Sequence, residues 1–519
     1  MRLLEELQNY SKKDVTPLHM PGHKRKGKGL PYNIDITEID DFDNLQNPNG
    51  ILKECLDKAD KVYRSFKTFY SVNGGTCGVL TALATYCDIG DKVIVATNCH
   101  KSVYNFIELF NLHAIYMSPK TNDWGIAKSF LVDDLRDIVN QNLDAKAVIL
   151  TSPTYEGVLS NIKEISTFLH SKKIPLIVDE AHGSHLILEG KSAINFGADI
   201  VLNSCHKTLS GLTQTALIHI GNDALNKEVV ARKLQDKLNK FQSSSPSYVL
   251  MASIDECVEF LIRHGKREIK RLQKNLKNFK KRSENLKYIK IFNFNQPFEC
   301  FDFDNSKIVI SASPYLTGSQ IMDELRKLGF ELEMSYNNYC LAMMTIFDND
   351  SIFEKFMNAL FKIDRKIEKN NKKAVKKDAF LINFTKKSSK IAKNQKKDES
   401  LGKDRSKNEE ISFYFKGAKD DFKNVKANEN FDRERKFVLT IHDAKMENGM
   451  AFNFSRAVGK VSQEYIYAYP PGSPILVPGE IVTEDFIEFM RILMKNGTVL
   501  HSTSKNHAKG KIMCLTKDF

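Results

Sequence analysis

The sequence lacks paired cysteines, a long apolar run and a secretion signal, and each absence excludes a class of protein. Its nine cysteines stand singly without a CxxC pair, which argues against a disulfide framework and a zinc site. No apolar run approaches the roughly 20 residues that a membrane-spanning helix needs. The first residues, MRLLEELQNYSKKD, form a charged amphipathic pattern without the apolar centre of a signal peptide. We therefore expect a cytoplasmic protein with no metal site and no membrane partner.

Positive charge is unevenly distributed along the 519 residues. The net charge is +13, yet residues 362–407 hold seventeen Lys and Arg against six Asp and Glu, so the rest carries about +2. This segment is rich in Lys, Asn and Ser and has little apolar periodicity, which predicts a solvated, flexible insertion. It lacks the interleaved aromatic side chains that stack on bases, so a nucleic-acid partner is not favoured. A loose contact with RNA or another anionic surface is the alternative.

Short apolar runs alternate with helical patterns between residues 69 and 220, and they predict an α/β fold. The runs are too continuously apolar for a sheet with one wet face, so a mostly parallel sheet covered by helices is expected. Ligands of such sheets bind beyond the carboxyl ends of the strands. The predicted strands begin at Lys92, Ala114, Ala145, Ile174, Asp199 and Ala216.

The remaining patterns predict several domains around this sheet. A large domain is expected over residues 46–265, preceded by an N-terminal segment over 1–45. A long, basic amphipathic helix from Asp255 to about Leu286 leads into a smaller α+β domain over 266–362. A Lys-rich insertion over 363–435 and a C-terminal domain over 436–519 complete the chain.

Two motifs place polar groups at expected strand ends. SVNGGTCGVLTALATY puts Gly74 and Gly75 before an apolar helix, where free N–H groups attract phosphate, although such glycines alone often mark only a turn. PLIVDEAHGSH ends a buried run at Asp179, and a carboxylate there needs a cation or hydrogen-bond donors. The alternatives are a helix cap or a metal site, for which Asp179, His182 and His185 would have to converge.

Two further motifs supply an amine and a ring. In SCHKTLSGLTQ, Lys207 lies 28 residues after Asp179, a spacing that suits neighbouring strands joined by one short crossover. In ATNCHKSVYNF, His100 follows a strand and either stacks on a flat ligand or serves as a structural histidine. A phosphate cradle, a carboxylate, a lysine and a stacking ring together describe a pyridoxal phosphate pocket. There Lys207 would form the Schiff base and Asp179 would keep the pyridine nitrogen protonated.

These motifs, with PLHMPGHKRKGKG, DITEIDDFDNLQNPNG, PTYEGV, SSSPSYVLMASID and YPPGSPILVPGE, occur in a familiar order. The chain resembles the group III Orn/Lys/Arg decarboxylases of the fold-type-I pyridoxal phosphate enzymes, over roughly residues 1–300 and 450–490. It resembles the short form without a receiver-like N-terminal domain. The resemblance implies a transferase-like fold with large, small and C-terminal domains, a homodimer or higher oligomer, and a role in polyamine biosynthesis.

The resemblance also assigns residues to the cofactor. The residues expected at its phosphate are Gly75, Thr76, Ser204 and His206. His100 is expected to stack on the ring, and Ala181 and His182 to pack at its other face. Lys207, Asp179 and His182 form the expected catalytic set.

Two more assignments concern the partner subunit and the substrate. Ser244 or Ser245 is expected to reach a phosphate across a dimer interface. Glu480 resembles the acidic residue that meets the distal cation of the substrate. Burial and the cofactor's charge should also lower the pKa of Lys207 enough to give a neutral amine.

Three positions depart from the family pattern. Gly75 stands where Ser or Thr is frequent, Glu156 replaces a frequent Tyr in the PTY motif, and Lys460 stands where GR is commoner. None of these departures touches the pair of Lys207 and Asp179. They therefore bear on substrate choice or assembly more than on the chemistry.

The expected activity is the pyridoxal phosphate-dependent decarboxylation of a basic amino acid, with arginine first and lysine or ornithine next. One alternative is an aminotransferase or aldolase on the same scaffold, which typically uses an arginine to grip the α-carboxylate. Another is a non-catalytic regulator that retained the fold.

Overall fold

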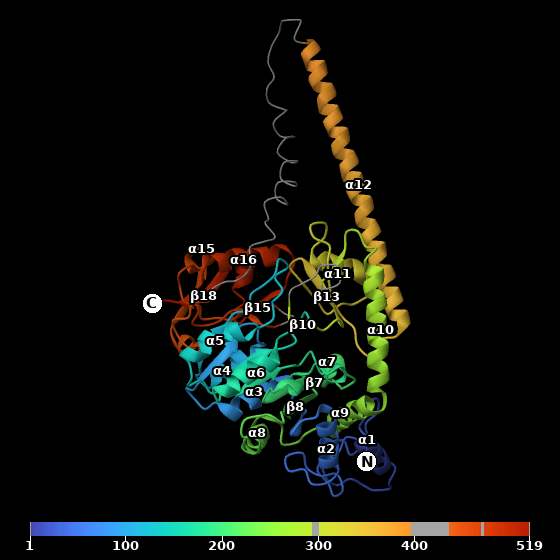
Figure 1. Ribbon diagram of the computed structural model, residues 1–519, viewed down its shortest axis with the longest axis vertical. Coiled ribbons are helices and arrows are strands. Elements are labelled where there is room, and N and C mark those ends of the chain that lie inside the picture. Colours follow the sequence, from blue (N-terminus) through green and yellow to red (C-terminus); the bar gives the residue numbers. More distant parts are fainter. Residues whose placement is uncertain (1, 293–299, 396–434, 469–471, 518–519) are drawn as a thin grey trace.

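A seven-stranded sheet forms the centre of the computed structural model, which describes residues 2–292, 300–395, 435–468 and 472–517 (Figure 1). Its strand order is β1-β8-β7-β6-β4-β2-β3. The strands are β1 (Lys67–Ser71), β2 (Lys92–Ala96), β3 (His113–Met117), β4 (Val148–Thr151), β6 (Leu176–Asp179), β7 (Ile200–Ser204) and β8 (Ala216–Ile220).

The sheet is mostly parallel, as predicted. Strands β3, β2, β4, β6 and β7 pair in parallel, whereas β8 runs antiparallel to both β7 and β1. Strands β6, β7 and β8 are buried along their whole length, which requires cover on both faces. All six predicted strands are present, and the α/β fold class is confirmed. The edge strand β1, of sequence KTFYS, was missed because it is not a continuous apolar run.

Helices cover the sheet and complete its largest hydrophobic core. They are α3 (Gly74–Tyr86), α4 (Lys101–Leu109), α5 (Val132–Gln141), α6 (Ile162–Ser171) and α8 (Lys227–Phe241). Helix α3 packs against β7 and β8, and Gly78 permits this close approach because a Cβ there would stand 3.2 Å from Leu202. The first turn of α3 is thereby held at the carboxyl ends of the strands.

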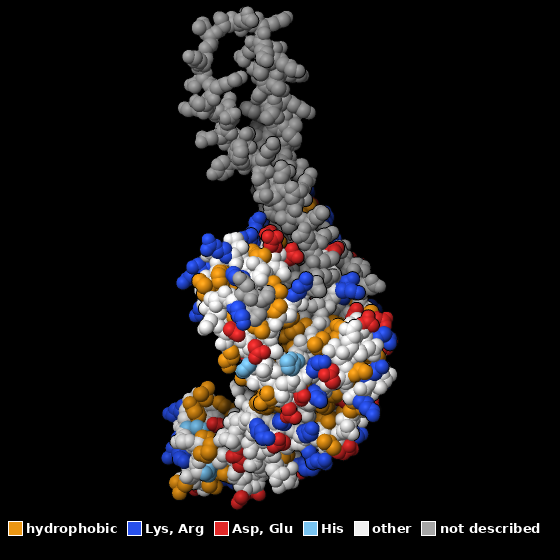
Figure 2. Space-filling model, turned by 90° about the vertical axis from the view of Figure 1, so that its left-hand side faces the viewer, with side chains coloured by type: hydrophobic (Ala, Val, Ile, Leu, Met, Phe, Trp, Pro, Cys, Tyr) orange, Lys and Arg blue, Asp and Glu red, His pale blue; other side chains and the backbone are white. Residues whose placement is uncertain are grey.

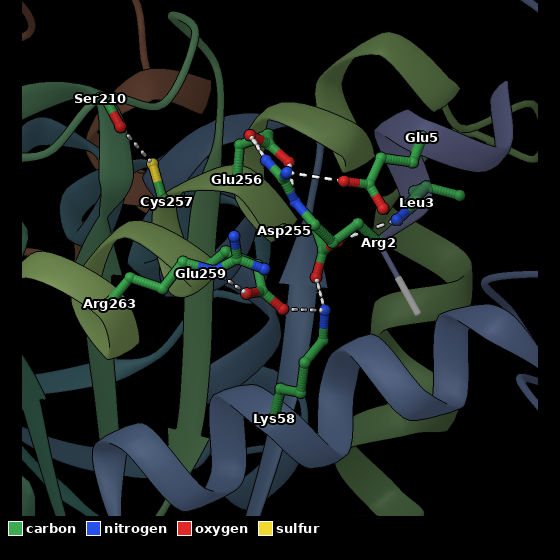
Figure 3. Close-up of polar contacts among 10 residues, drawn as sticks. All are labelled: Arg2, Leu3, Glu5, Lys58, Ser210, Asp255, Glu256, Cys257, Glu259 and Arg263. Carbon is green, nitrogen blue, oxygen red and sulfur yellow. Dashed lines mark hydrogen bonds and ion pairs between the residues drawn. The ribbon is translucent and has the colours of Figure 1, made fainter. Parts of the chain in front are cut away.

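A buried carboxylate ties the N-terminal helix to the large domain (Figure 3). Asp255 accepts the backbone N–H of Leu3 at 3.0 Å and pairs with Lys58 Nζ at 2.5 Å. These groups join α1 (Leu3–Ser11), α2 (Ile51–Tyr63) and α9 (Tyr248–Phe260). The long helix expected from Asp255 begins earlier, at Tyr248, and passes through a π-helical turn over Leu261–Gly265 into α10 (Lys266–Ser283).

The small domain packs on α10 with a four-stranded sheet in the order β12-β13-β11-β9. Its elements are β9 (Lys290–Ile291), β11 (Lys307–Ser311), α11 (Gly318–Lys327), β12 (Met334–Tyr336) and β13 (Tyr339–Met343). A separate two-stranded pair, β5 (Val158–Leu159) with β10 (Asp302–Phe303), joins this part of the chain to the large domain. The small domain therefore stands directly beside the ends of the central strands.

Helix α12 (Asp350–Gln395) projects away from the body, beside α10 at its base (Figure 1). The first part of the predicted Lys-rich insertion, 363–395, thus continues a helix that begins in the small domain. Lysine is a good helix former, and extending an existing helix costs less than nucleating one, so a Lys-rich sequence can continue it. The remaining part of the predicted insertion, 396–434, lies outside the described residues, and the domain boundaries stay predictions.

The C-terminal part forms its own core around Phe486 and Met490. Its elements are α14 (Ile441–Met446), β14 (Gly449–Asn453), α15 (Phe454–Ala457), β15 (Ile466–Ala468), β16 (Pro474–Leu476), α16 (Glu484–Lys495), β17 (Leu500–Ser502) and β18 (Lys511–Leu515). The hydroxyl of Tyr465 donates to Glu108 on α4 at 2.7 Å, which fastens this part to the large domain.

Three chain-wide features complete the description. Across the described residues, no helix combines the length and apolarity needed to span a bilayer. Within the same ranges, no group of three His, Cys, Asp or Glu side chains is arranged to hold a metal ion. All nine cysteines are unpaired, and eight of them are buried, while Cys300 is partly exposed.

Candidate active site

A cavity of about 860 Å³ lies at the carboxyl ends of the parallel strands, between the large and small domains. Nine of the residues singled out from the sequence line it. They are Gly75, Thr76, His100, Asp179, Ala181, His182, Ser204, His206 and Lys207. Motifs that are far apart in the chain thus meet in one place, as strand ends in a parallel sheet must.

The glycine turn leaves the start of α3 open to an anion. Gly74 has φ +77°, which favours glycine. Asn73 makes no side-chain cap to α3, and its Oδ1 instead accepts the N–H of Ser243 at 3.4 Å. The N–H groups of the first turn therefore keep their capacity to bind a phosphate. A Cβ on Gly75 would stand 2.9 Å from Ser204 Oγ, so the absence of a side chain keeps a gap between α3 and β7.

Asp179 and Lys207 stand on neighbouring strands. Asp179 is the last residue of β6, is buried, and accepts the N–H of Ala181 at 3.1 Å. Lys207 lies on the short helix α7 (Cys205–Thr208) directly after β7. Burial lowers the pKa of Lys207, while the charges of Asp179 and Glu333 partly oppose that shift. The expected depression of the lysine pKa is therefore present.

His182 holds the amine of Lys207. Its Nε2 lies 2.9 Å from Lys207 Nζ. Burial, together with the charges of Lys207 and Lys307, lowers the pKa of His182 well below its ordinary value. A neutral imidazole can accept a hydrogen bond from the amine. His182 can therefore orient Lys207 without placing a second positive charge beside it.

His100 and His206 line the cavity as uncharged rings. His100 caps α4 by accepting the N–H of Ser102 at 3.3 Å, and burial lowers its pKa to about 4. His206 donates from Nδ1 to the carbonyl of Thr215 at 3.1 Å, and burial lowers its pKa as well. His100 is therefore a helix cap that also lines the cavity, and its stacking on a flat ligand stays a prediction.

Two predicted residues lie outside the cavity wall. Ser244 is exposed. The N–H of the preceding residue, Ser243, donates to Asn73, which lines the cavity. Glu480 is fully buried, and its Oε2 accepts from Arg435 Nη2 at 2.6 Å and Nε at 3.1 Å. Within one chain the carboxylate expected to meet the substrate cation is thus already paired with Arg435, which itself lines the cavity.

The cavity also contains side chains to which sequence reasoning gave no role. Glu156 and Tyr155, after β4, face Tyr339 and Glu333 of the small domain. Tyr339 donates to Glu156 at 2.8 Å, and Tyr155 donates to Glu333. The PTYEGV motif marked Glu156 only as a departure. Glu333 and Arg435 lie in stretches without a motif, so no local signal pointed to them.

A buried network of charged side chains holds the backbone of this wall in place. Lys307 on β11 donates to Asp304 at 2.9 Å and to the carbonyl of His182 at 3.1 Å. Although burial opposes it, the ammonium of Lys307 holds the pKa of Asp304 well below its usual range. His185 Nε2 lies 3.3 Å from the same carboxylate. The small domain therefore fixes the backbone on which His182 stands.

The residues present fit pyridoxal phosphate. The open start of α3 and the gap between Gly75 and Ser204 suit its phosphate. The buried carboxylate of Asp179 suits a protonated ring nitrogen, and the low pKa of Lys207 suits a reaction with the aldehyde. In the described part of the chain, Nδ1 of His182 is buried without a hydrogen-bond partner, which also indicates a polar ligand in this space.

Comparison with known families agrees with this arrangement. The family model described as the Orn/Lys/Arg decarboxylase major domain matches residues 2–309, and the model of the family's C-terminal domain matches 427–500. The chain belongs to the Orn/Lys/Arg decarboxylase family. Membership in this pyridoxal phosphate family implies the same cofactor that the residues fit.

Individual relatives match along almost the whole chain. An arginine decarboxylase of Bacillus anthracis is 28% identical over 517 residues, covering 95% of this chain and 93% of the relative. An arginine decarboxylase of Bacillus subtilis is 26% identical, with coverages of 93% and 91%. The crystal structure of the Francisella novicida lysine decarboxylase LdcF has a TM-score of 0.77 at 20% identity, covering 99% of this chain and 80% of that one. That structural likeness supports the fold-type-I architecture.

Proposed function

We propose that this chain decarboxylates a basic amino acid with pyridoxal phosphate, and that arginine is its first substrate. The cavity that joins Lys207, Asp179 and His182 at the strand ends carries the proposal, together with the family match. Arginine is placed first because the two Bacillus relatives named above are arginine decarboxylases. Lysine and ornithine come next.

Three residues of the cavity, Asp179, Lys207 and His182, each have a defined task in this reaction. When bound, the cofactor supplies an aldehyde and an electron-accepting ring. Asp179 holds a proton at the ring nitrogen, because a buried carboxylate favours a cationic partner. Lys207 supplies an amine as nucleophile and proton carrier, and burial lowers its pKa toward the neutral form. His182 holds Nζ of Lys207 in place at 2.9 Å.

Replacing Lys207 by alanine tests the proposal. We expect the Lys207→Ala protein to lose carbon dioxide release from arginine by at least about 10²-fold, the scale of a lost nucleophile or proton-transfer group. The exposed Lys233→Ala variant should keep the wild-type rate and serves as the control. Assays with arginine, lysine and ornithine rank the substrates.

Cofactor attachment gives a second readout. Borohydride treatment of the wild type with pyridoxal phosphate should fix the cofactor to residue 207, as read by peptide mapping. A colourless protein without that mark, or a Lys207→Ala variant at the wild-type rate, contradicts the proposal. Keto-acid formation without carbon dioxide would indicate an aminotransferase instead. The one arginine among the described residues of the cavity wall, Arg435, is already held by Glu480.

We also infer that two copies associate. Leu18 is 90% exposed, Leu30 is 67% exposed and Met20 is 51% exposed, all in the N-terminal segment. Figure 2 shows hydrophobic side chains gathered on a lobe that a hollow separates from the body, at the height of this segment in Figure 1. Clustered exposed apolar side chains favour a protein contact. The contact of Ser244 with a phosphate across the interface stays a prediction. The cytoplasmic location and the role in polyamine biosynthesis stay predictions.

A further inference from the structure

Two carboxylates in the cavity wall have no cation of their own. Glu156 Oε1 accepts the hydroxyl of Tyr339 at 2.8 Å, and Glu333 accepts that of Tyr155. Neither has a lysine or arginine partner among the described residues. Carboxylates that face a cavity without a counter-ion favour the binding of a cation.

Glu480 offers a direct contrast. Its carboxylate is fully buried, pairs with Arg435 and also accepts the N–H of Val477 at 3.2 Å. Both N–H groups of Arg435 donate to the same oxygen, Oε2, so within one chain this carboxylate is already neutralised by a guanidinium. The hydrogen-bond partners of Glu156 and Glu333 are neutral hydroxyl groups, which leave the negative charge of each carboxylate for a substrate cation.

The tyrosine partners hold both carboxylates in position from the opposite domain. Burial, together with the charge of Glu156, raises the pKa of Tyr339 well above its ordinary value, so the hydroxyl remains a donor. Tyr336 and Tyr339 lie with their ring centroids 5.8 Å apart, and both line the cavity with Tyr155. Carboxylates among aromatic rings suit a guanidinium, which is planar, stacks on rings and accepts bidentate pairing.

A continuous row of side chains connects this place to the reacting amine. Lys207 contacts His182, whose ring centroid lies 4.2 Å from that of Tyr155, and Tyr155 donates to Glu333. Glu333 is also near enough for its charge to act on Lys207. An amino acid that presents its α-amine to Lys207 can therefore direct its side chain along this wall.

We propose that Glu156 and Glu333 bind the distal cation of the substrate, and that Tyr155, Tyr336 and Tyr339 favour a guanidinium over an ammonium group. This inference rests on the proposed function and names the residues that decide its substrate. The site is formed jointly by the loop after β4 and by the small domain.

Isosteric substitutions test it on the cofactor-loaded protein. For Glu156→Gln and Glu333→Gln we expect KM for arginine to rise about tenfold or more, the scale of one lost charge-assisted hydrogen bond. Cofactor absorbance should stay at the wild-type level. Glu331→Gln is the matched control, because Glu331 lies two positions from Glu333, does not line the cavity and pairs with Arg326 at 2.7 Å.

Substrate preference gives the second measurement. Tyr336→Leu should lower the ratio of kcat/KM for arginine over lysine several-fold, whereas Glu331→Gln should leave it unchanged. Arginine KM values within twofold of wild type in both glutamine variants would overturn the assignment of the carboxylates. An unchanged ratio in Tyr336→Leu would overturn the role of the rings.

The failure of this inference can be told apart from that of the proposed function. If the wild type releases no carbon dioxide from any basic amino acid, the proposed function fails. Titrating arginine against the visible absorbance of the loaded wild type and of both glutamine variants then still tests the carboxylates. Equal arginine affinity in all three proteins would reject them as the cation site.

Discussion

Lys307 is a lysine whose side chain is fully buried, next to the equally buried Asp304. Its Nζ donates hydrogen bonds to the carboxylate of Asp304 and to the carbonyl of His182. Lys307→Met leaves the carboxylate of Asp304 buried without its ammonium partner, with His185 and the N–H of Ser306 as its remaining polar contacts. We expect the free energy of unfolding to fall by about 3–5 kcal/mol, the cost of breaking a buried pair on one side, as measured by chemical denaturation.

Two further variants serve as controls for the Lys307→Met experiment. Lys327→Met removes a largely exposed ion pair with Glu324, so its effect should stay within about 1 kcal/mol. The double variant Lys307→Met with Asp304→Leu removes both buried charges and should recover part of the loss. A Lys307→Met protein as stable as Lys327→Met would show that the network does not hold the wall.

The sequence predicted the position of those cavity residues that belong to a motif at the end of a strand. Asp179 and Lys207 each follow a buried apolar run, and parallel strands bring such ends together. It could not place Glu333, because that residue reaches the cavity only through the packing of the small domain. It assigned Glu480 to the distal cation of the substrate, but no local signal pointed to its pairing with Arg435, which lies 45 positions earlier in the chain.

At the level of elements, a half-buried ion pair joins the end of α6 to the start of β7. His170 Nε2 lies 2.8 Å from Asp199 Oδ2, and Asp199 also accepts the N–H groups of Leu176 and Leu225, each at 2.7 Å. The hydrogen bond to Asp199 raises the pKa of His170 above its ordinary value. The pair thus fastens the end of α6 to the residue that precedes β7, the strand after which Lys207 stands.

The raised pKa fixes the pH dependence of this contribution. A group with a higher pKa in the folded state adds its full stability below the unfolded-state pKa, and loses it as pH rises through the folded-state pKa. His170→Gln should therefore lower the free energy of unfolding more at about pH 5.5 than at about pH 9, by on the order of 1 kcal/mol. The exposed His113→Gln variant should show no such difference. A loss that is equal at both pH values would mean that His170 acts only as a neutral donor.

Elements with a clear hydrophobic pattern could be predicted from the sequence, whereas the boundaries between them could not. The six predicted strands stood out as continuous apolar runs, and in β6, β7 and β8 burial along the whole strand leaves no polar alternation. The boundary between α9 and α10 did not, because the π-helical turn continues the helix and its glycine, Gly265, keeps a helical backbone with φ −51°. The sequence indicated no end for α12, because low apolar content in a lysine-rich stretch predicts neither a helix nor its boundary, although lysine favours helices.

At the level of the whole molecule, the proposed dimer depends on exposed leucines of the N-terminal segment. Replacing both Leu18 and Leu30 by aspartate removes apolar contact area worth about 1.5–3 kcal/mol for each fully buried side chain. The dissociation constant should therefore rise at least about tenfold for each substitution. Sedimentation equilibrium measures it directly.

Leu143→Asp is the matched control, since Leu143 is 57% exposed but lies in the large domain after α5. This variant should keep the wild-type mass. A wild type that sediments as a monomer at micromolar concentration contradicts the dimer. A double variant that stays dimeric shows that the contact lies on another surface.

The burial of the thiols has a practical consequence. Since none of the nine cysteines is fully exposed, alkylating dyes will leave the native fold almost unlabelled. A cysteine introduced at Asp323 on α11 and another at Glu488 on α16, both largely exposed acids, would then be the preferred points of attachment for a donor and acceptor fluorophore. Energy transfer between them would report in real time how far the small and C-terminal domains move when an amino acid enters.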